Sequence, residues 1–347
     1  MVLYMMKTGK IPESVLKRSV LKQIKTKREE VVIGAGIGED CAILSFDGNE
    51  KISVTTDSMS VVGDMWQKDE KEAMEIAVKN AFHTSMNNLA ASGAKPVAVM
   101  VSAFLPAGIE EAVIKAGTEQ MEKECASLKV QAAGGHTEVS EAVNYPIITI
   151  TGLGIIESES EYSVRRIKPG QDIVVSKWIG LEGTALLART KEKELHTKYP
   201  VRFIEDAKQF DRFLSIVPEA ATAVKSNVSA MHDVSKGGIF AALWEMAQGA
   251  GVGLEIDLKK LPLKQETVEV CEFFEISPYE LLSGGCLLMT TDNGYDLVRV
   301  LESKNISAVV IGKTTESNDR VVINEEERRF LEPPKSDEID KIITNQP

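Results

Sequence analysis

Four short segments, which occur in one order along the chain, constrain its fold and chemistry more than any other feature. Each places a polar or acidic side chain beside small residues at the edge of an apolar run. Glycine at such a position lets the backbone approach a ligand closely. Carboxylates held in this way suit Mg²⁺, which proteins usually bind through one or two carboxylates plus substrate phosphates. The segments are residues 36–44, 55–58, 88–96 and 134–137.

The size and charge of the chain narrow the functions that it can serve. Its 347 residues, 43% of them hydrophobic, are enough for two or three domains with a large core. A net charge of −12 argues against nucleic acid or an anionic membrane as the main partner, since both need basic patches. We expect no signal peptide and no membrane span. Four scattered cysteines, spaced for neither a zinc site nor a redox motif, predict a cytoplasmic protein with reduced thiols.

Hydrophobic patterning predicts strands and helices in both halves of the chain. In the first half we expect helices at residues 12–24, 71–92 and 109–125, and strands at residues 41–46, 52–55, 97–103, 130–133 and 146–156. In the second half we expect helices at residues 181–190, 202–216, 237–249 and 296–304, and strands at residues 172–176, 252–256, 285–290 and 308–311. This order allows either a doubly wound parallel sheet or an α+β design.

A charged and polar stretch marks the boundary between the two halves. It is followed by a turn at residues 167–170 and then by the first strand of the second half. We therefore expect an N-terminal domain over residues 1–158, a C-terminal domain over residues 167–324 and a charged tail over residues 325–347.

Two of the four segments place a carboxylate at the edge of a strand. Gly36 and Gly38 form a turn whose amides can cradle phosphate, and Asp40 in the same turn can hold a metal. The alternative is a hairpin turn with a polar cap, because no helix follows as a dinucleotide-binding fingerprint requires. Asp57 lies where a buried strand ends, and a helix cap or an Asx turn explains it equally well.

The other candidates lie in or next to predicted helices and in one predicted loop. Asn88 is inside a helix, where Asn costs helix propensity, so it has either a function or an exposed position. Gly134, Gly135 and His136 follow a strand; either His136 lies near phosphates, or the loop only satisfies its own hydrogen bonds. Asp233 precedes a helix whose N-terminus can bind an anion, although Asp233 is also a good helix cap.

Taken together, these segments resemble the aminoimidazole ribonucleotide (AIR) synthetase superfamily, over roughly residues 34–313. The superfamily includes the hydrogenase maturation protein HypE, selenophosphate synthetase and thiamine-monophosphate kinase, and the chain is most similar to the HypE-like branch. That similarity rests on residues 38–42, 88–96 and 232–238. The resemblance implies an α+β N-terminal domain that dimerises through its strands into a β-barrel, and an α+β C-terminal domain with helices over a mixed sheet. ATP with Mg²⁺ would lie in the cleft between the domains, near the dimer interface.

The resemblance also implies roles for individual residues. Asp40 and Asp57 match metal ligands, and Asn88 stands where the family usually has a further Asp ligand. His136 stands where HypE has Asp, while selenophosphate synthetase has the same Gly-Gly-His-Thr sequence. Asp233 and Lys236 would face the phosphates or the substrate. The glycines of the first and fourth segments would supply room and amides for the nucleotide; they are Gly36, Gly38, Gly134 and Gly135.

Departures from the family pattern leave three hypotheses open. The last cysteine is Cys286, so we expect that the chain does not process a C-terminal cysteine of its own as HypE does. Asn88, His136 and Lys236 each replace an Asp found in relatives, which lowers the negative charge available for Mg²⁺. The leading hypothesis is an ATP- and Mg²⁺-dependent phosphoryl-transfer enzyme that acts on a small or protein-borne acceptor, with a role in hydrogenase maturation. The alternatives are a non-catalytic nucleotide-binding scaffold and a thiamine-monophosphate kinase-like enzyme.

Overall fold

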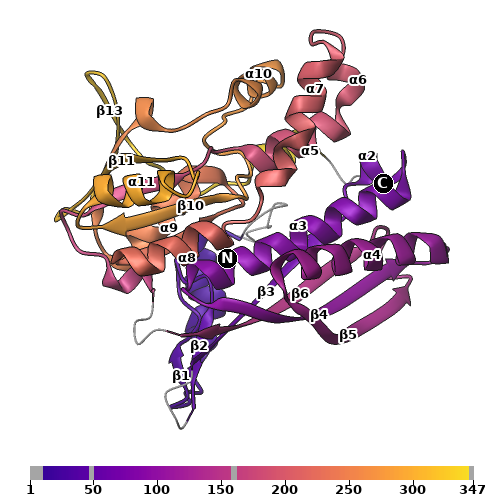
Figure 1. Ribbon diagram of the computed structural model, residues 1–347, viewed down its shortest axis with the longest axis horizontal. Coiled ribbons are helices and arrows are strands. Elements are labelled where there is room, and N and C mark those ends of the chain that lie inside the picture. Colours follow the sequence, from indigo (N-terminus) through magenta and orange to yellow (C-terminus); the bar gives the residue numbers. More distant parts are fainter. Residues whose placement is uncertain (1–10, 47–50, 158–161, 344–347) are drawn as a thin grey trace, which may run out of the picture.

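The computed structural model describes residues 11–46, 51–157 and 162–343, and the chain forms two α+β domains (Figure 1). Each domain is built on one sheet, and in each sheet one pair of neighbouring strands is parallel while the others are antiparallel. The predicted α+β class with mixed sheets is therefore confirmed. The turn expected at residues 47–49 lies outside the described residues.

The N-terminal sheet has the strand order β1-β2-β3-β6-β4-β5. Its strands are β1 (Val31–Ile33), β2 (Ala42–Ser45), β3 (Lys51–Ser60), β4 (Lys95–Pro106), β5 (Gln131–Ser140) and β6 (Ile147–Ile156). The helices of this half are α1 (Glu13–Val15), α2 (Gly63–Trp66), α3 (Glu70–Ala91) and α4 (Glu111–Leu128). α3 begins where the Asp69 side chain accepts hydrogen bonds from two backbone amides, and it ends before Gly93, which adopts a positive φ of 81°.

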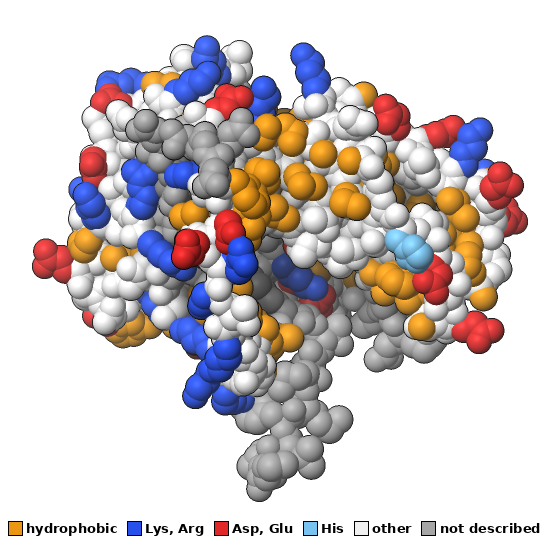
Figure 2. Space-filling model, turned by 90° about the horizontal axis from the view of Figure 1, so that it is seen from below, with side chains coloured by type: hydrophobic (Ala, Val, Ile, Leu, Met, Phe, Trp, Pro, Cys, Tyr) orange, Lys and Arg blue, Asp and Glu red, His pale blue; other side chains and the backbone are white. Residues whose placement is uncertain are grey.

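One face of the N-terminal sheet is covered by α3 and α4, and the other face is open (Figure 1). Val99 and Leu105 of β4 point into the core under the helices, while Met100 and Phe104 alternate with them and are exposed. Ile155 of β6 is exposed as well. Figure 2, which views the molecule from the side of this sheet, shows apolar side chains gathered across it. Within the described residues of one chain the sheet is open, and it closes no barrel.

The C-terminal sheet has the strand order β13-β12-β9-β11-β7-β10-β8. Its strands are β7 (Asp172–Ser176), β8 (Ala230–Val234), β9 (Gly253–Asp257), β10 (Cys286–Thr291), β11 (Ala308–Thr315), β12 (Arg320–Asn324) and β13 (Glu327–Phe330). α9 (Gly238–Ala250) packs on one face, and α8 (Val217–Ala223) and α11 (Gly294–Glu302) pack on the other. The remaining helices are α5 (Leu181–Thr190), α6 (Glu192–Leu195), α7 (Val201–Lys208) and α10 (Gln265–Phe273).

Several elements differ from the expectation. β8 was not predicted, because His232 and Asp233 interrupt its apolar pattern. β5 was expected to end at residue 133 but continues through two glycines, which are depleted in strands. The helix expected at residues 202–216 ends at Lys208 and gives way to a 3₁₀ turn. β13 lies in the part of the chain that was expected to be a tail, and it pairs with β12.

The two domains are joined by a buried amide near the end of α3. Asn87 donates from Nδ2 to the carbonyl oxygen of Leu214 at 2.8 Å and accepts at Oδ1 from the amide of Ile216 at 3.0 Å. The buried amide of Asn87 therefore has hydrogen-bond partners inside the helix–domain interface, because it binds the backbone of the other domain. In the described part of the chain, no helix is both long and apolar enough to span a bilayer.

Candidate functional site

A cavity of about 280 Å³ lies where the two domains meet, and it gathers most of the residues that the sequence singled out. The turn before β2 supplies Asp40, β3 supplies Asp57, α3 supplies Asn88 and β8 supplies Asp233. Asp57 lies inside β3 and not at the end of a strand as predicted, because the pairing with β6 continues to Ser60. The turn, the strands and the helix bring together side chains that are far apart in the sequence. The other residues that line the cavity are Ile11, Glu13, Leu16, Gly36, Ile37, Gly38, Glu39, Thr55, Thr56, His232, Ser235, Glu245, Pro334 and Lys335.

Asp57 and Asn88 form a pair on the N-terminal side of the cavity. The Asn88 Nδ2 donates to Asp57 Oδ2 at 2.6 Å and to the Thr55 hydroxyl at 3.3 Å. That hydroxyl donates in turn to the backbone carbonyl of Asp40 at 3.2 Å. Asn88 therefore uses its amide nitrogen to orient the carboxylate of Asp57, which leaves its Oδ1 as the atom that could hold a cation.

Asp40 lies against a buried histidine that the sequence analysis had not assigned a role. Asp40 Oδ1 is 2.7 Å from His232 Nδ1, and His232 Nε2 is 3.5 Å from Glu245 Oε2. Burial alone lowers the pKa of His232, but Asp40 and Glu245 outweigh it and raise the pKa to about 10. The two carboxylates therefore favour the protonated form of His232. In the sequence, the feature that could have pointed to His232 is its position directly before Asp233 in the motif at residues 232–238.

Asp233 is the most unusual group in the cavity. Its backbone amide donates to Asp40 Oδ2 at 3.2 Å, but neither of its own carboxylate oxygens has a hydrogen-bond partner among the described residues. Its side chain is only 3% exposed. Burial, followed by the neighbouring Asp40, raises the pKa of Asp233 well above its ordinary value. A buried carboxylate without a partner is costly, so this position favours a bound cation or a proton.

These residues fit a hard divalent cation such as Mg²⁺. The carboxylates of Asp40, Asp57 and Asp233 and the Oδ1 of Asn88 are all oxygen donors, which is the donor set that Mg²⁺ prefers. Across the described ranges, no three histidine, cysteine or acidic side chains converge as a complete metal site. The donor set therefore suits Mg²⁺ that also takes ligands from phosphate and water, rather than a cation held by protein alone.

The glycine turn before β2 packs closely against α9 at the edge of the cavity. Gly38 adopts a positive φ of 76°, and a Cβ there would lie 2.8 Å from the carbonyl oxygen of Glu245. The turn can approach α9 closely because residue 38 is glycine. Glu39 faces the domain linker, where it accepts from the Ser163 hydroxyl at 2.7 Å and pairs with Arg165 Nε at 3.0 Å. Burial raises the pKa of Glu39.

The anion site expected at the N-terminus of α9 is occupied by the protein itself. The Gly237 amide donates to Asp337 Oδ2 at 2.5 Å, and the Gly238 amide donates to the Ser235 carbonyl. Lys236 is not among the residues that line the cavity; it is half-exposed and lies 3.6 Å from Asp340. The interpretation of this helix N-terminus as a phosphate site is therefore wrong. The sequence could not reveal it, because Asp337 is 100 residues away.

Gly134, Gly135 and His136 do not join the acidic cavity within one chain. They belong to β5 and not to a loop, and they line a separate cavity of about 360 Å³ together with residues of β4 and α4. The imidazole of His136 is exposed and lies 3.2 Å from Glu138. The expectation that these residues surround the same phosphates as Asp40 is not met by the single chain.

Family models match both domains. Residues 38–156 match the N-terminal domain of AIR synthase related proteins, and residues 168–324 match the C-terminal domain of the same family. A Methanocaldococcus jannaschii protein, provisionally named a hydrogenase expression/formation protein, is 25% identical over 96% of this chain and 97% of its own. The carbamoyl dehydratase HypE of Rhodobacter capsulatus is 29% identical, over 61% of this chain and 60% of its own length.

Solved structures share the fold. AaThiL complexed with AMPPCP and TMP superposes with a TM-score of 0.72 and 21% identity, covering 94% of this chain and 99% of that one. HypE in complex with ATP gives a TM-score of 0.69 and 17% identity, covering 94% and 95%. Because the two family models match most of its length, the chain belongs to the family of AIR synthase related proteins.

Proposed function

We propose that this protein is an ATP- and Mg²⁺-dependent enzyme of the HypE-like branch, which transfers the γ-phosphoryl group to a small or protein-borne acceptor during hydrogenase maturation. The observation that carries the proposal is the carboxylate of Asp233, which is buried without a partner beside Asp40 and Asp57. Such a cluster is stabilised by a divalent cation. Support comes from relatives named as HypE and from a HypE structure that contains ATP.

Asp40 and Asp57 would hold Mg²⁺, with Asn88 holding Asp57 in place. The metal would neutralise negative charge on the β- and γ-phosphates as they react. The acceptor oxygen forms a bond to the γ-phosphorus while the bond to the bridging oxygen breaks; ADP leaves, and a proton on the acceptor passes to water. His232 offsets the charge of Asp40, so the cavity remains tolerant of an anionic nucleotide.

A second copy of the chain would cover the open face of the N-terminal sheet. The open face of the N-terminal sheet exposes Met100, Phe104 and Ile155, an apolar surface that water would otherwise cover. We propose that this face forms the homodimer, with the nucleotide bound near the interface. His136, on the exposed edge strand β5, would then belong to the nucleotide site of the assembled dimer. Light scattering at micromolar concentration should give twice the mass of one chain, and a monomer there would contradict this proposal.

The reduced negative charge of the proposed metal site favours a second candidate, a nucleotide-binding scaffold with little turnover. Asn88 contributes no negative charge, and Asp40 is already paired with His232. The two candidates differ in whether bound ATP is consumed.

ADP release from ATP, followed with and without Mg²⁺, tests the proposal. We expect Mg²⁺-dependent ADP formation that increases when a suitable acceptor is present. Thiamine monophosphate should be included, because a dependence on it would indicate a thiamine-monophosphate kinase-like enzyme. Tight binding of ATP with Mg²⁺ but no ADP, with every acceptor, would instead identify the scaffold.

A further inference from the structure

Positive charge is concentrated in one short stretch near the start of the described chain, residues 17–28, which we call the basic segment. Six of its residues are Lys or Arg, and none is acidic. Because the net charge of −12 includes these six positive charges, the rest of the chain carries −18. A block of like charge that opposes the charge of its own protein is typical of an interaction surface.

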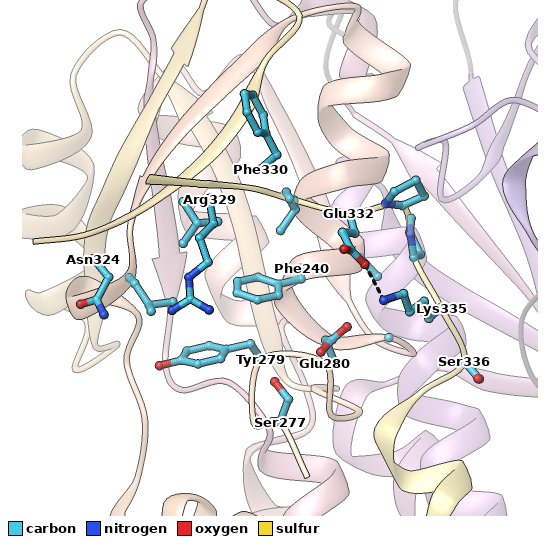
Figure 3. A pocket seen from close by; sticks show the side chains of 17 residues that line it. Phe240, Ser277, Tyr279, Glu280, Asn324, Arg329, Phe330, Glu332, Lys335 and Ser336 are labelled. Carbon is cyan, nitrogen blue, oxygen red and sulfur yellow. Dashed lines mark hydrogen bonds and ion pairs between the residues drawn. The ribbon is translucent and has the colours of Figure 1, made fainter. Parts of the chain in front are cut away.

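Most charges of the basic segment are not neutralised by the protein itself. Four of the six cations are exposed and have no acidic partner within the described ranges. Around the acidic cavity, in contrast, Arg165 pairs with Glu39, and Lys335 pairs with Glu332. Lys335 lines both the acidic cavity and the neighbouring cavity shown in Figure 3. The four exposed cations of the basic segment are Arg18, Lys22, Lys25 and Lys27.

The basic segment overlaps an amphipathic helical stretch whose apolar side is uncovered. The stretch consists of α1, a π turn at Leu16–Val20 and a 3₁₀ turn at Leu21–Gln23, and none of its residues is buried. Val20 is 42% exposed, and Ile24, which follows the stretch, is 48% exposed. Cations and apolar side chains therefore alternate along one exposed surface, which suits a partner that has both negative charge and apolar groups.

The residues that precede the basic segment fix its position. Ile11, Glu13 and Leu16 line the acidic cavity. The indole nitrogen of Trp244 in α9 donates to Glu13 Oε2 at 2.9 Å, which fastens the start of the helical stretch to the C-terminal domain. The basic segment therefore begins at the edge of the acidic cavity and continues away from it over the surface.

The composition of the basic segment selects among negatively charged partners. It has no aromatic side chain, so it lacks the rings that stack on unpaired bases or lie at the surface of a bilayer. A duplex or a bilayer is an extended polyanion, and much of it would face the −18 carried by the rest of the chain. A peptide that contacts the basic segment alone avoids this repulsion, since charges farther away than about 8 Å are largely screened. A protein partner therefore fits better than nucleic acid or membrane.

We propose that the basic segment is a docking surface for another protein, which binds through a stretch of acidic and apolar residues. Its carboxylates would pair with the four exposed cations, and its apolar side chains would cover Val20 and Ile24. A protein docked in this way lies at the edge of the acidic cavity, where a protein-borne acceptor would meet the nucleotide. That delivery role rests on the proposed phosphoryl transfer, whereas docking can be tested without it.

Matched anionic probes test the proposal by fluorescence anisotropy on the full chain at low salt. The first probe is a labelled peptide of repeated Glu-Glu-Leu-Ala, the second has Ser in place of Leu, and the third is an oligothymidylate with the same number of charges. We expect the first peptide to bind most tightly, with the other two weaker by about fivefold or more, and added salt to weaken it.

The same probes can overturn the proposal. Binding of the oligothymidylate as tightly as the first peptide would identify a nucleic-acid surface instead. Sedimentation of the chain with vesicles that contain anionic lipid, at concentrations where the first peptide does not bind, would identify a membrane surface. No binding of the first peptide at millimolar concentration would also overturn the proposal.

Two double variants locate the binding surface. Lys22→Glu with Lys25→Glu reverses two exposed charges and should weaken the first peptide by about tenfold or more. Val20→Ser with Ile24→Ser keeps the charge and should weaken the same peptide by about fivefold or more, because its leucines lose their apolar contacts. Circular dichroism verifies that both variants are folded. Unchanged affinity in both would place the peptide elsewhere and overturn the proposal.

Lys115→Glu with Lys123→Glu, at two exposed lysines of α4, is the matched control. It changes the net charge by the same amount as the charge reversal in the basic segment, and it should bind the first peptide as the unmodified chain does. Equal weakening by this control would show that the peptide responds to net charge alone, which would overturn the proposal.

A parallel titration with ATP and Mg²⁺ separates docking from the proposed function. If ATP binds and the peptide does not, the docking surface is wrong and the phosphoryl site is unaffected. If the peptide binds at the basic segment and ATP does not bind, the proposed function fails, and with it the delivery role, while docking stands.

Discussion

The two cavities that adjoin at Pro334 and Lys335 differ in how their charges are arranged. In the acidic cavity, buried or half-buried charges interlock: His232 lies between Asp40 and Glu245, and Asp233 has no partner. In the second cavity, of about 440 Å³ between the start of α9, the loop at residues 277–280 and the segment at residues 329–336, the Phe240–Tyr279 stack is exposed to the cavity (Figure 3) and the basic groups are already paired with acidic ones. Charges held at low dielectric act strongly on a cation and its phosphates, while an aromatic face contacts a ligand mainly through its shape. The acidic cavity is therefore suited to charged groups, and the second cavity to a flat apolar one.

The largest expected effect comes from removing one charge of the acidic cavity. Asp40→Asn keeps the volume and an acceptor for the Asp233 amide but leaves His232 without its closest anion. We expect ADP formation to fall by roughly 100-fold or more, because charge stabilisation is the main catalytic term in phosphoryl transfer. Initial rates at saturating ATP and Mg²⁺ measure this, with circular dichroism to verify folding.

Asp206→Asn is the matched control, since Asp206 is half-exposed on α7 and pairs weakly with Arg202 at 3.9 Å. It should leave the rate unchanged. An unchanged rate in Asp40→Asn itself would show that the metal is held elsewhere. The buried charges of the acidic cavity would then have no role in the reaction.

The next effect is a pH dependence of stability. The pKa of His232 is raised to about 10 from 6.5, so its stabilisation is complete below pH 6.5 and is lost as the pH rises toward 10. We expect the unfolding midpoint of the unmodified chain to fall by several degrees across this window. His232→Gln should be less stable at pH 6.5. Its unfolding midpoint should also change less with pH, because it lacks the titrating imidazole while the contribution of Asp233 is the same in both chains.

His196→Gln, at a half-exposed histidine near Glu192, is the control and should reproduce the unmodified profile. Parallel profiles for His232→Gln and the unmodified chain would mean that the imidazole is neutral in the folded state. The acidic cavity would then be more negative than described above.

Asp337 fastens the segment after β13 to the start of α9, and its effect should be intermediate. Asp337→Asn replaces one accepting oxygen by a donor, so one of three buried amides loses its partner. We expect a loss of about 1–3 kcal/mol in the free energy of unfolding. Chemical denaturation measures it, with Asp319→Asn at an exposed loop position as the control. If Asp337→Asn loses no more free energy of unfolding than Asp319→Asn does, the segment that follows β13 is held in place by other contacts.

The smallest effect concerns Asn88, the uncharged residue that we propose as a ligand in the acidic cavity. Asn88→Asp would place a second carboxylate against Asp57, where the amide now donates at 2.6 Å. Without Mg²⁺ we expect a destabilisation of about 1 kcal/mol from like-charge repulsion, and Mg²⁺ should reverse it. Unfolding midpoints with and without Mg²⁺ measure this, against Asn318→Asp on the surface. A scaffold should gain Mg²⁺ affinity, whereas an enzyme suited to Asn should gain no rate.

Much of the fold and half of the site could be predicted from local patterns. The helices α3 and α5 were confirmed almost to the residue, and Asp40, Asp57, Asn88 and Asp233 do meet in one cavity. These residues share a local signal, a polar group at the edge of an apolar run.

What could not be predicted depends on partners distant in the sequence. The pairing of His232 with Asp40 spans 192 positions, and the hydrogen bond from the Gly237 amide, just before α9, to Asp337 spans 100. Residues 134–136 lie in a strand because β4 supplies the pairing, which overrides the low strand propensity of glycine. Their separation from Asp40 within one chain also depends on tertiary structure.

We propose that the acidic cavity binds ATP together with Mg²⁺. The most direct test is the unfolding midpoint of the unmodified chain with both ligands, with each alone, and with ADP. A ligand at a hundred times its dissociation constant stabilises the folded state by about 2.7 kcal/mol, which moves the midpoint by several degrees. We expect a rise that requires both ATP and Mg²⁺. No rise over a wide concentration range, or the same rise with ATP alone, would contradict it.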